Sequence, residues 1–153
     1  MTRTRGAVVV RASLLAIALA CALLAACSRE PVLEVEEAWI REAPEGATVL
    51  AGYMRVVHRH GEALELVGAD SPHFARVELH ATRTDGERVR MEQLDTVELS
   101  GDVTRFEPGG LHLMLISPDG EVRAGDLIPV GLHFSDGRRL DADFEVRDVR
   151  PRG

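Results

Sequence analysis

Two histidines and two methionines recur within one stretch of the chain, and side chains of these types bind soft metal ions. The spacing is His80, ten residues, Met91, twenty residues, and then His112-x-Met114. The whole chain has six histidines and four methionines, one of them the initiator, so this concentration is informative. Imidazole nitrogens combined with thioether sulfurs favour Cu(I) over Zn²⁺ or Mg²⁺ and need no carboxylate.

The elements that must position these side chains are predicted to be β-strands. Residues two apart in a strand point to the same face, so His112 and Met114 share a face, and His80 points outward from its own strand. The alternate residues, which we expect to face the core, are Val77, Leu79, Leu111, Leu113 and Leu115. A hairpin turn at residues 84–87 would bring Met91 back alongside His80.

Other assignments of these residue types stay open. An His-x-Met pair occurs by chance on strands, and Met91 could fill a gap in the core. His58-x-His60 beside a turn is a possible weak second site for Cu(II) or Zn²⁺, although an exposed loop pair is more often solvated. We assign Trp39 and Tyr53 to core packing.

The N-terminus has the features of a lipoprotein signal peptide. Three arginines precede an apolar run over residues 12–24 that is too short for a good membrane-spanning helix. The run ends in Leu24-Ala25-Ala26-Cys27, which resembles a lipobox, so we expect cleavage after residue 26 and lipidation of Cys27. Ser28 is not the aspartate that retains lipoproteins at the inner membrane, which favours the outer membrane. The alternative is a soluble periplasmic protein.

Cysteine usage and charge exclude several classes of function. After cleavage, Cys27 is the only cysteine, so the mature chain has no disulfide, CxxC pair, thiol nucleophile or blue-copper thiolate. Removing a leader with three arginines and no acidic residue changes the net charge from −7 to about −10. This charge argues against nucleic acid and anionic lipid as partners.

The rest of the chain predicts one all-β domain. Short apolar segments alternate with turn residues at spacings of about ten, which indicates eight or nine strands in a β-sandwich or Greek-key barrel. We place the signal peptide at residues 1–26, the lipidated cysteine and a short tether at 27–31, and the β domain at 32–149. We find no motif for an enzyme among these residues.

The chain resembles the PCuAC-type periplasmic copper chaperones. Their pattern is a His, about ten residues, a Met, about twenty-one residues, and then HxM, which His80, Met91, His112 and Met114 match. The likeness extends to further blocks over nearly the whole domain: 38–41, 52–54, 76–80 and 108–115. The sequence departs from the pattern at Ala81, where a Met is frequent, in the one-residue-shorter second gap, and in the lipobox.

The resemblance implies a cupredoxin-like β-barrel with one Cu(I) at an exposed site of His80, Met91, His112 and Met114. It also implies copper transfer to an acceptor during assembly of the cytochrome c oxidase copper centres. The acceptor would be an oxidase subunit or a thioredoxin-like copper-assembly protein, with the lipid anchor holding the donor at the membrane. The alternative is a lipid-anchored β-sandwich binding module of the envelope with an incidental His/Met cluster.

Overall fold

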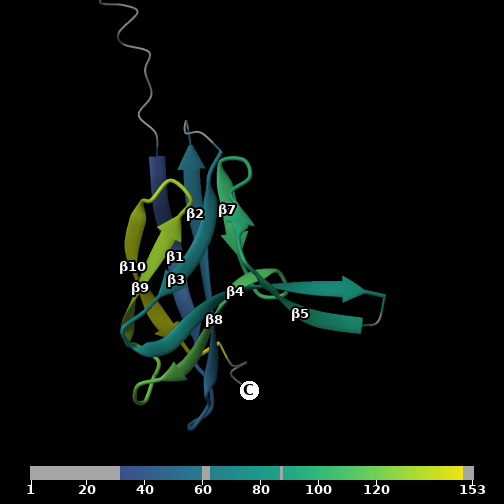
Figure 1. The fold of residues 1–153 in the computed structure, drawn as a ribbon. Helices are drawn as coiled ribbons and strands as arrows, with labels where there is room; N and C mark the ends of the chain where they lie inside the picture. Colours follow the sequence, from purple (N-terminus) through teal and green to yellow (C-terminus); the bar gives the residue numbers. More distant parts are fainter. Residues whose placement is uncertain (1–31, 60–62, 87, 150–153) are drawn as a thin grey trace, which may run out of the picture. The chain divides into compact units, whose positions relative to one another are not determined.

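The described part of the chain consists of β-strands. The structure, a computed structural model, describes residues 32–59, 63–86 and 88–149 (Figure 1). None of these residues forms a helix that could cross a membrane. The described strands are β1 (Val32–Arg41), β2 (Val49–Arg59), β3 (Glu65–Asp70), β4 (Phe74–Asp85), β5 (Arg88–Leu94), β6 (Val97–Glu98), β7 (Val103–Phe106), β8 (Leu111–Pro118), β9 (Leu127–Phe134) and β10 (Arg139–Arg147). The predicted all-β class is confirmed, whereas the predicted signal peptide, Cys27 and the tether lie outside the described residues.

The strands form one sheet that closes on itself. Its order is β5-β4-β8-β7-β2-β1-β10-β9-β3-β6, and a further pairing of β3 with β4 joins Ala69 to Val77 and closes the ring. The first half of β2 pairs with β8, and its second half pairs with β7. Strand β7 is therefore inserted between one end of β8 and β2. On its other side, β8 pairs with β4 along most of its length.

The barrel interior is filled by alternate residues of these strands. Leu113 and Leu115 of β8 are fully buried, as the period-two pattern predicts, and they belong to one core cluster with Ile40, Val130 and Phe144. Gly52 lies directly against this cluster. A Cβ at position 52 would stand 3.0 Å from Leu115 Cδ1 and 3.5 Å from Leu113 Cβ. The missing side chain therefore makes room for Leu115 to pack against the backbone of β2.

The β4–β5 hairpin extends away from the other strands (Figure 1). The Asp85–Arg88 pair closes it, which confirms the predicted turn, and Gly86 adopts a positive φ of 61° there. Strand β5 is exposed along almost its whole length and pairs only with β4 among the described strands. The outer strand of the hairpin therefore packs less than the strands of the barrel, which have neighbours on both sides.

Replacement of Gly52 by valine should destabilise the barrel by about 1–3 kcal/mol, because the new methyl groups overpack the interior beside Leu115. The matched control is Gly68→Val, since a Cβ at position 68 has no neighbour within 4 Å. Denaturant unfolding of both variants measures the difference. Equal midpoints for the two variants would show that the approach of β2 to Leu115 does not limit packing.

Candidate metal centre

The four predicted ligands lie on one face of three adjacent strands. In the antiparallel β4–β8 pair, His80 is the partner of His112, and Glu78 is the partner of Met114. On the other side of β4, Met91 of β5 is the partner of Thr82. Positions 78, 80 and 82 share a face of β4 because they are two residues apart. Met91 and Met114 therefore flank the histidine pair diagonally, on opposite sides.

The two imidazoles are close together and buried. The ring centroids of His80 and His112 are 5.8 Å apart with an interplanar angle of 39°. The exposed fractions are 8% for His80 and 5% for His112. Both rings are therefore buried, whereas the resemblance implied an exposed site. Cross-strand pairing holds the two rings beside each other without a metal ion.

Each imidazole uses one nitrogen in a hydrogen bond and leaves the other without one. His112 Nδ1 lies 3.1 Å from the carbonyl oxygen of Gly110. His80 Nε2 lies 2.9 Å from Glu78 Oε2, while His80 Nδ1 is buried with no hydrogen-bond partner. A buried nitrogen without a partner carries a desolvation cost of about 1–3 kcal/mol. A bound metal ion would supply the missing partner, so the site fits one.

The two thioethers differ in exposure. Met91 is 65% exposed on the β4–β5 hairpin, whereas Met114 is half-buried within the barrel wall. Among the described residues, no group of three His, Cys, Asp or Glu side chains is arranged to hold a metal ion. The structure brings His80, His112 and Met114 onto one face and places Met91 beside them. Their role as ligands stays a prediction.

An aromatic row continues from the imidazoles across the barrel wall. The Tyr53 ring lies 6.5 Å from that of His112, and the Trp39 ring lies 4.6 Å from that of Tyr53, measured between centroids. A bulge at Glu37, whose φ is 52°, shifts the register of β1 so that Trp39 comes opposite Tyr53. Tyr53 is buried, as expected from its assignment to packing, but its ring also forms a wall of the site.

Glu78 lies on the same face as the histidines and was not among the residues predicted from the sequence. Its carboxylate accepts a hydrogen bond from His80 and another, of 2.7 Å, from Nε of Arg76. These two interactions, the one from His80 being the larger, lower the pKa of the Glu78 carboxyl below its usual value. The signal in the sequence was its position two residues before His80, which puts both side chains on one face.

The structure describes one residue of the predicted second site at His58 and His60. His58 is buried on β2, paired with Leu33, and it is not part of an exposed loop. Its Nε2 is buried without a hydrogen-bond partner. His60 lies outside the described residues, so the pair itself stays untested.

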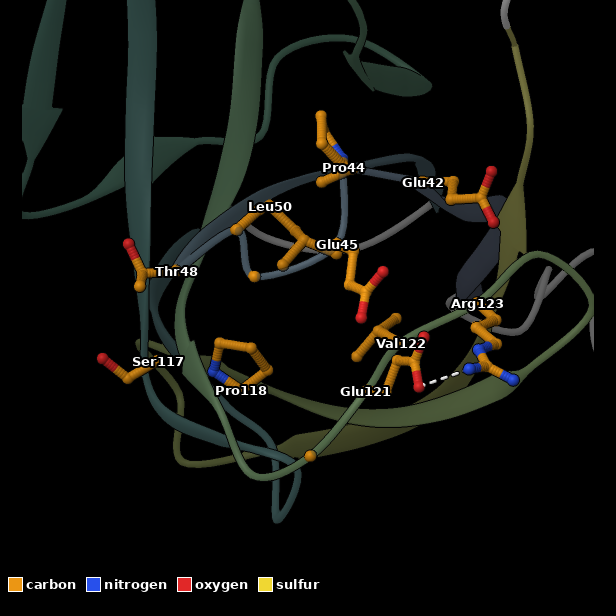
Figure 2. A pocket seen from close by; sticks show the side chains of 14 residues that line it. Glu42, Pro44, Glu45, Thr48, Leu50, Ser117, Pro118, Glu121, Val122 and Arg123 are labelled. Atoms are coloured by element: carbon orange, nitrogen blue, oxygen red, sulfur yellow. Dashed lines mark hydrogen bonds and ion pairs between the residues drawn. The ribbon is translucent and has the colours of Figure 1, made fainter.

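A separate cavity of about 760 Å³ lies between the loops at residues 42–48 and 117–123 (Figure 2). Glu121 and Arg123 form an ion pair of 2.5 Å on its wall. This cavity adjoins the end of β8, whereas His112 is near the start of that strand, about 17 Å away at 3.3 Å per residue. The cavity is therefore distinct from the His/Met face.

Comparison with known proteins identifies a sequence family. The family model described as "LpqE-like: Putative lipoprotein LpqE-like" matches residues 33–146. A relative from Leifsonia xyli subsp. xyli (strain CTCB07), "Putative lipoprotein Lxx21020", is 31% identical over 118 residues. The match covers 76% of this chain and 70% of the relative.

Solved structures share the fold. The copper-bound PCuAC domain from PmoF2 matches with a TM-score of 0.64 and 22% identity, over 78% of this chain and 99% of that domain. The Cu(I) form of DR1885 from Deinococcus radiodurans matches with a TM-score of 0.65 and 22% identity, over 82% and 84% of the two chains. The cupredoxin-like barrel predicted from the sequence is confirmed, as is the resemblance to PCuAC domains at the level of the fold.

Burial raises the pKa of the Tyr53 phenol above its ordinary value of 10.0, an effect that the charge of Arg41 partly opposes. Tyr53 is the only tyrosine, so the ultraviolet absorbance of phenolate reports it alone. We expect its titration midpoint above that of the unfolded chain. The phenol then contributes stability below about pH 10 that is lost as pH rises through the folded-state pKa. Tyr53→Phe is the control without this transition, and a midpoint at or below the unfolded value would contradict burial of the ring.

Proposed function

Because the chain belongs to the LpqE-like family and has the fold of PCuAC domains, we propose that it is a Cu(I) carrier of the cell envelope. In this proposal one Cu(I) ion is the cargo. It is bound by His80, Met91, His112 and Met114 and is passed on to an acceptor protein. The names of the structural relatives mention copper, and this is consistent with the proposal.

The observation that carries the proposal is the histidine pair. His80 and His112 are opposite each other on β4 and β8, with ring centroids 5.8 Å apart, and His80 Nδ1 has no hydrogen-bond partner. Burying a polar atom without a partner is unfavourable, and such atoms in native proteins call for an explanation. A metal ion bound by both rings explains why two buried histidines stand side by side, with one ring nitrogen left without a hydrogen-bond partner.

The thioethers favour Cu(I) over other ions. Met91 and Met114 lie on the same face as the histidines, one on each side of them. Thioether sulfur is a soft donor that suits Cu(I), whereas Mg²⁺ and Ca²⁺ need oxygen ligands. A blue-copper centre requires a thiolate, and the only cysteine of the predicted mature chain is the one assigned to lipidation.

The unequal exposure of the ligands fits transfer by ligand exchange. Met91 is 65% exposed on the hairpin, whereas both imidazoles are buried. A donor atom of the acceptor can therefore bind copper first where Met91 leaves, with the imidazoles still attached. Each step forms one bond to copper and breaks another, and the ion remains Cu(I) throughout. The process needs no oxidant, reductant or proton source.

We propose that a lipid anchor holds this carrier at the periplasmic face of the envelope. The support is the lipobox-like pattern ending at Cys27 and the lipoprotein name of the relative that is 31% identical. The tether of residues 28–31 is very short, so the domain would act close to the membrane. Assembly of the cytochrome c oxidase copper centres, with an oxidase subunit or a thioredoxin-like assembly protein as acceptor, is the proposed destination.

The decisive test compares two equally exposed residues of the hairpin. Met91 and Val89 are each 65% exposed, and they share a face of β5 because they are two residues apart. Met91→Ala should weaken Cu(I) binding by roughly tenfold or more, which is about 1.4 kcal/mol, because a thioether ligand is lost. Val89→Ala, which removes a comparable apolar group, should bind as the wild type does. Competition titration against a Cu(I) chelator measures both affinities.

A wild-type protein that binds Cu(I) no better than the Met91→Ala and Met114→Ala variants would overturn the carrier function. The alternative, a lipid-anchored binding module with an incidental His/Met cluster, predicts this outcome. Met54 provides a further control because it is almost fully buried within the core cluster. Met54→Leu should leave Cu(I) affinity unchanged, whether or not it lowers stability.

The anchor is tested separately by replacing each cysteine. Cys27→Ala should abolish the diacylglycerol adduct and release the protein from membrane fractions, because no acyl chain remains to anchor it. Cys21→Ala should leave both unchanged, since residue 21 lies in the predicted leader. Mass spectrometry of the mature protein reads out the adduct. An unmodified Cys27 in the wild type would reject the anchor and leave the soluble periplasmic form.

A further inference from the structure

A carboxylate lies within the proposed copper face without being one of the proposed ligands. Glu78 is two residues before His80 on β4 and opposite Met114 on β8. Its side chain is only 18% exposed, and Oε2 lies 2.9 Å from His80 Nε2. This partly buried carboxylate has a specific contact with one nitrogen of one proposed ligand. This contact determines which nitrogen of His80 is available to a metal ion.

The contact fixes the proton of the His80 ring. An ionised carboxylate can only accept hydrogen bonds, so the neutral imidazole must carry its hydrogen on Nε2. The lone pair of that tautomer is on Nδ1, and this is the atom that is buried without a hydrogen-bond partner. The hydrogen bond and the unpartnered nitrogen are separate observations, and both identify Nδ1 as the free donor.

We propose that Glu78 is a positioning residue that holds His80 in its Nε2–H tautomer and so makes Nδ1 the nitrogen that binds Cu(I). This inference deepens the proposed carrier function and rests on it. Arg76 extends the arrangement by donating a hydrogen bond of 2.7 Å to the other oxygen of the same carboxylate. The chain Arg76–Glu78–His80 thus orients a ligand from behind, as carboxylates commonly do for metal-binding histidines.

His112 is held in the opposite way. Its Nδ1 lies 3.1 Å from the Gly110 carbonyl oxygen, which can only accept, so the hydrogen is on Nδ1 and the lone pair is on Nε2. The two imidazoles therefore present different nitrogens. The Gly110 carbonyl holds the His112 ring, and the Glu78 carboxylate holds the His80 ring. Only the donor strength of His80 therefore depends on an acidic side chain. Glu78 itself is a poor direct ligand, because hard oxygen donors do not suit Cu(I).

The test uses Glu78→Ala and a matched control, Glu145→Ala. Glu145 forms the same kind of ion pair with an arginine two positions away, Arg147, also at 2.7 Å, but contacts no histidine. Nitrogen-15 spectra of the imidazoles in the metal-free proteins report the tautomer, and chelator competition reports Cu(I) affinity. We expect Nε2–H at His80 in the wild type and in Glu145→Ala, both with the same affinity. Glu78→Ala should lose this preference and bind Cu(I) roughly 10–100-fold more weakly.

Glu78→Gln separates the tautomer from the charge. Its amide oxygen can still accept from Nε2, so it should keep the tautomer and bind more tightly than Glu78→Ala. An Nδ1–H tautomer of His80 in the wild type would overturn the inference. So would an unchanged tautomer and affinity in Glu78→Ala, or Glu78→Gln binding as weakly as Glu78→Ala while the tautomer is kept. Because the spectra need no copper, a wild type that fails to bind Cu(I) would reject the carrier function and not the tautomer.

Discussion

The register between β4 and β8 is the constraint on which the proposed site depends. It places His80 opposite His112 and Glu78 opposite Met114. A slip of one residue would turn one strand's alternate residues into the core and separate the two rings. The same alternation that buries Leu113 inside the barrel puts His112 on the other face. Packing of the core and alignment of the proposed ligands are therefore one requirement, imposed on the same pair of strands.

The site combines a rigid part with a loosely held part. The histidines are on strands of the closed barrel and both are buried, so their rings have little freedom. Met91 is on an exposed hairpin whose outer strand, β5, has no second neighbour among the described strands. A rigid pair of donors favours retention of a metal ion, and a loosely held donor favours its release. A transfer protein needs both properties in one site.

The strands and the face shared by the four residues were predictable from the sequence, because both follow from local patterns. Period-two alternation placed His112 with Met114, and the turn before Arg88 predicted that Met91 returns beside β4. Burial of the rings was not predictable in this way. It depends on β2, which places the Tyr53 ring beside that of His112. It also depends on a bulge at Glu37, which no turn motif in the sequence predicts. Burial of the two imidazole rings therefore follows from contacts between strands that are distant in the sequence, which local patterns do not predict.

The role proposed for Glu78 also depends on contacts that the local sequence does not predict. Its position two residues before His80 was visible in the sequence, but many strand glutamates simply face water. What distinguishes Glu78 is that its neighbours on β8 are a histidine and a methionine, so its carboxylate is largely covered and faces a ring. A surface carboxylate with the same arginine spacing, Glu145, has Trp39 and Leu127 as its partners on the neighbouring strands. The role proposed for Glu78 therefore depends on the pairing of β4 with β8, and the residue type alone does not reveal it.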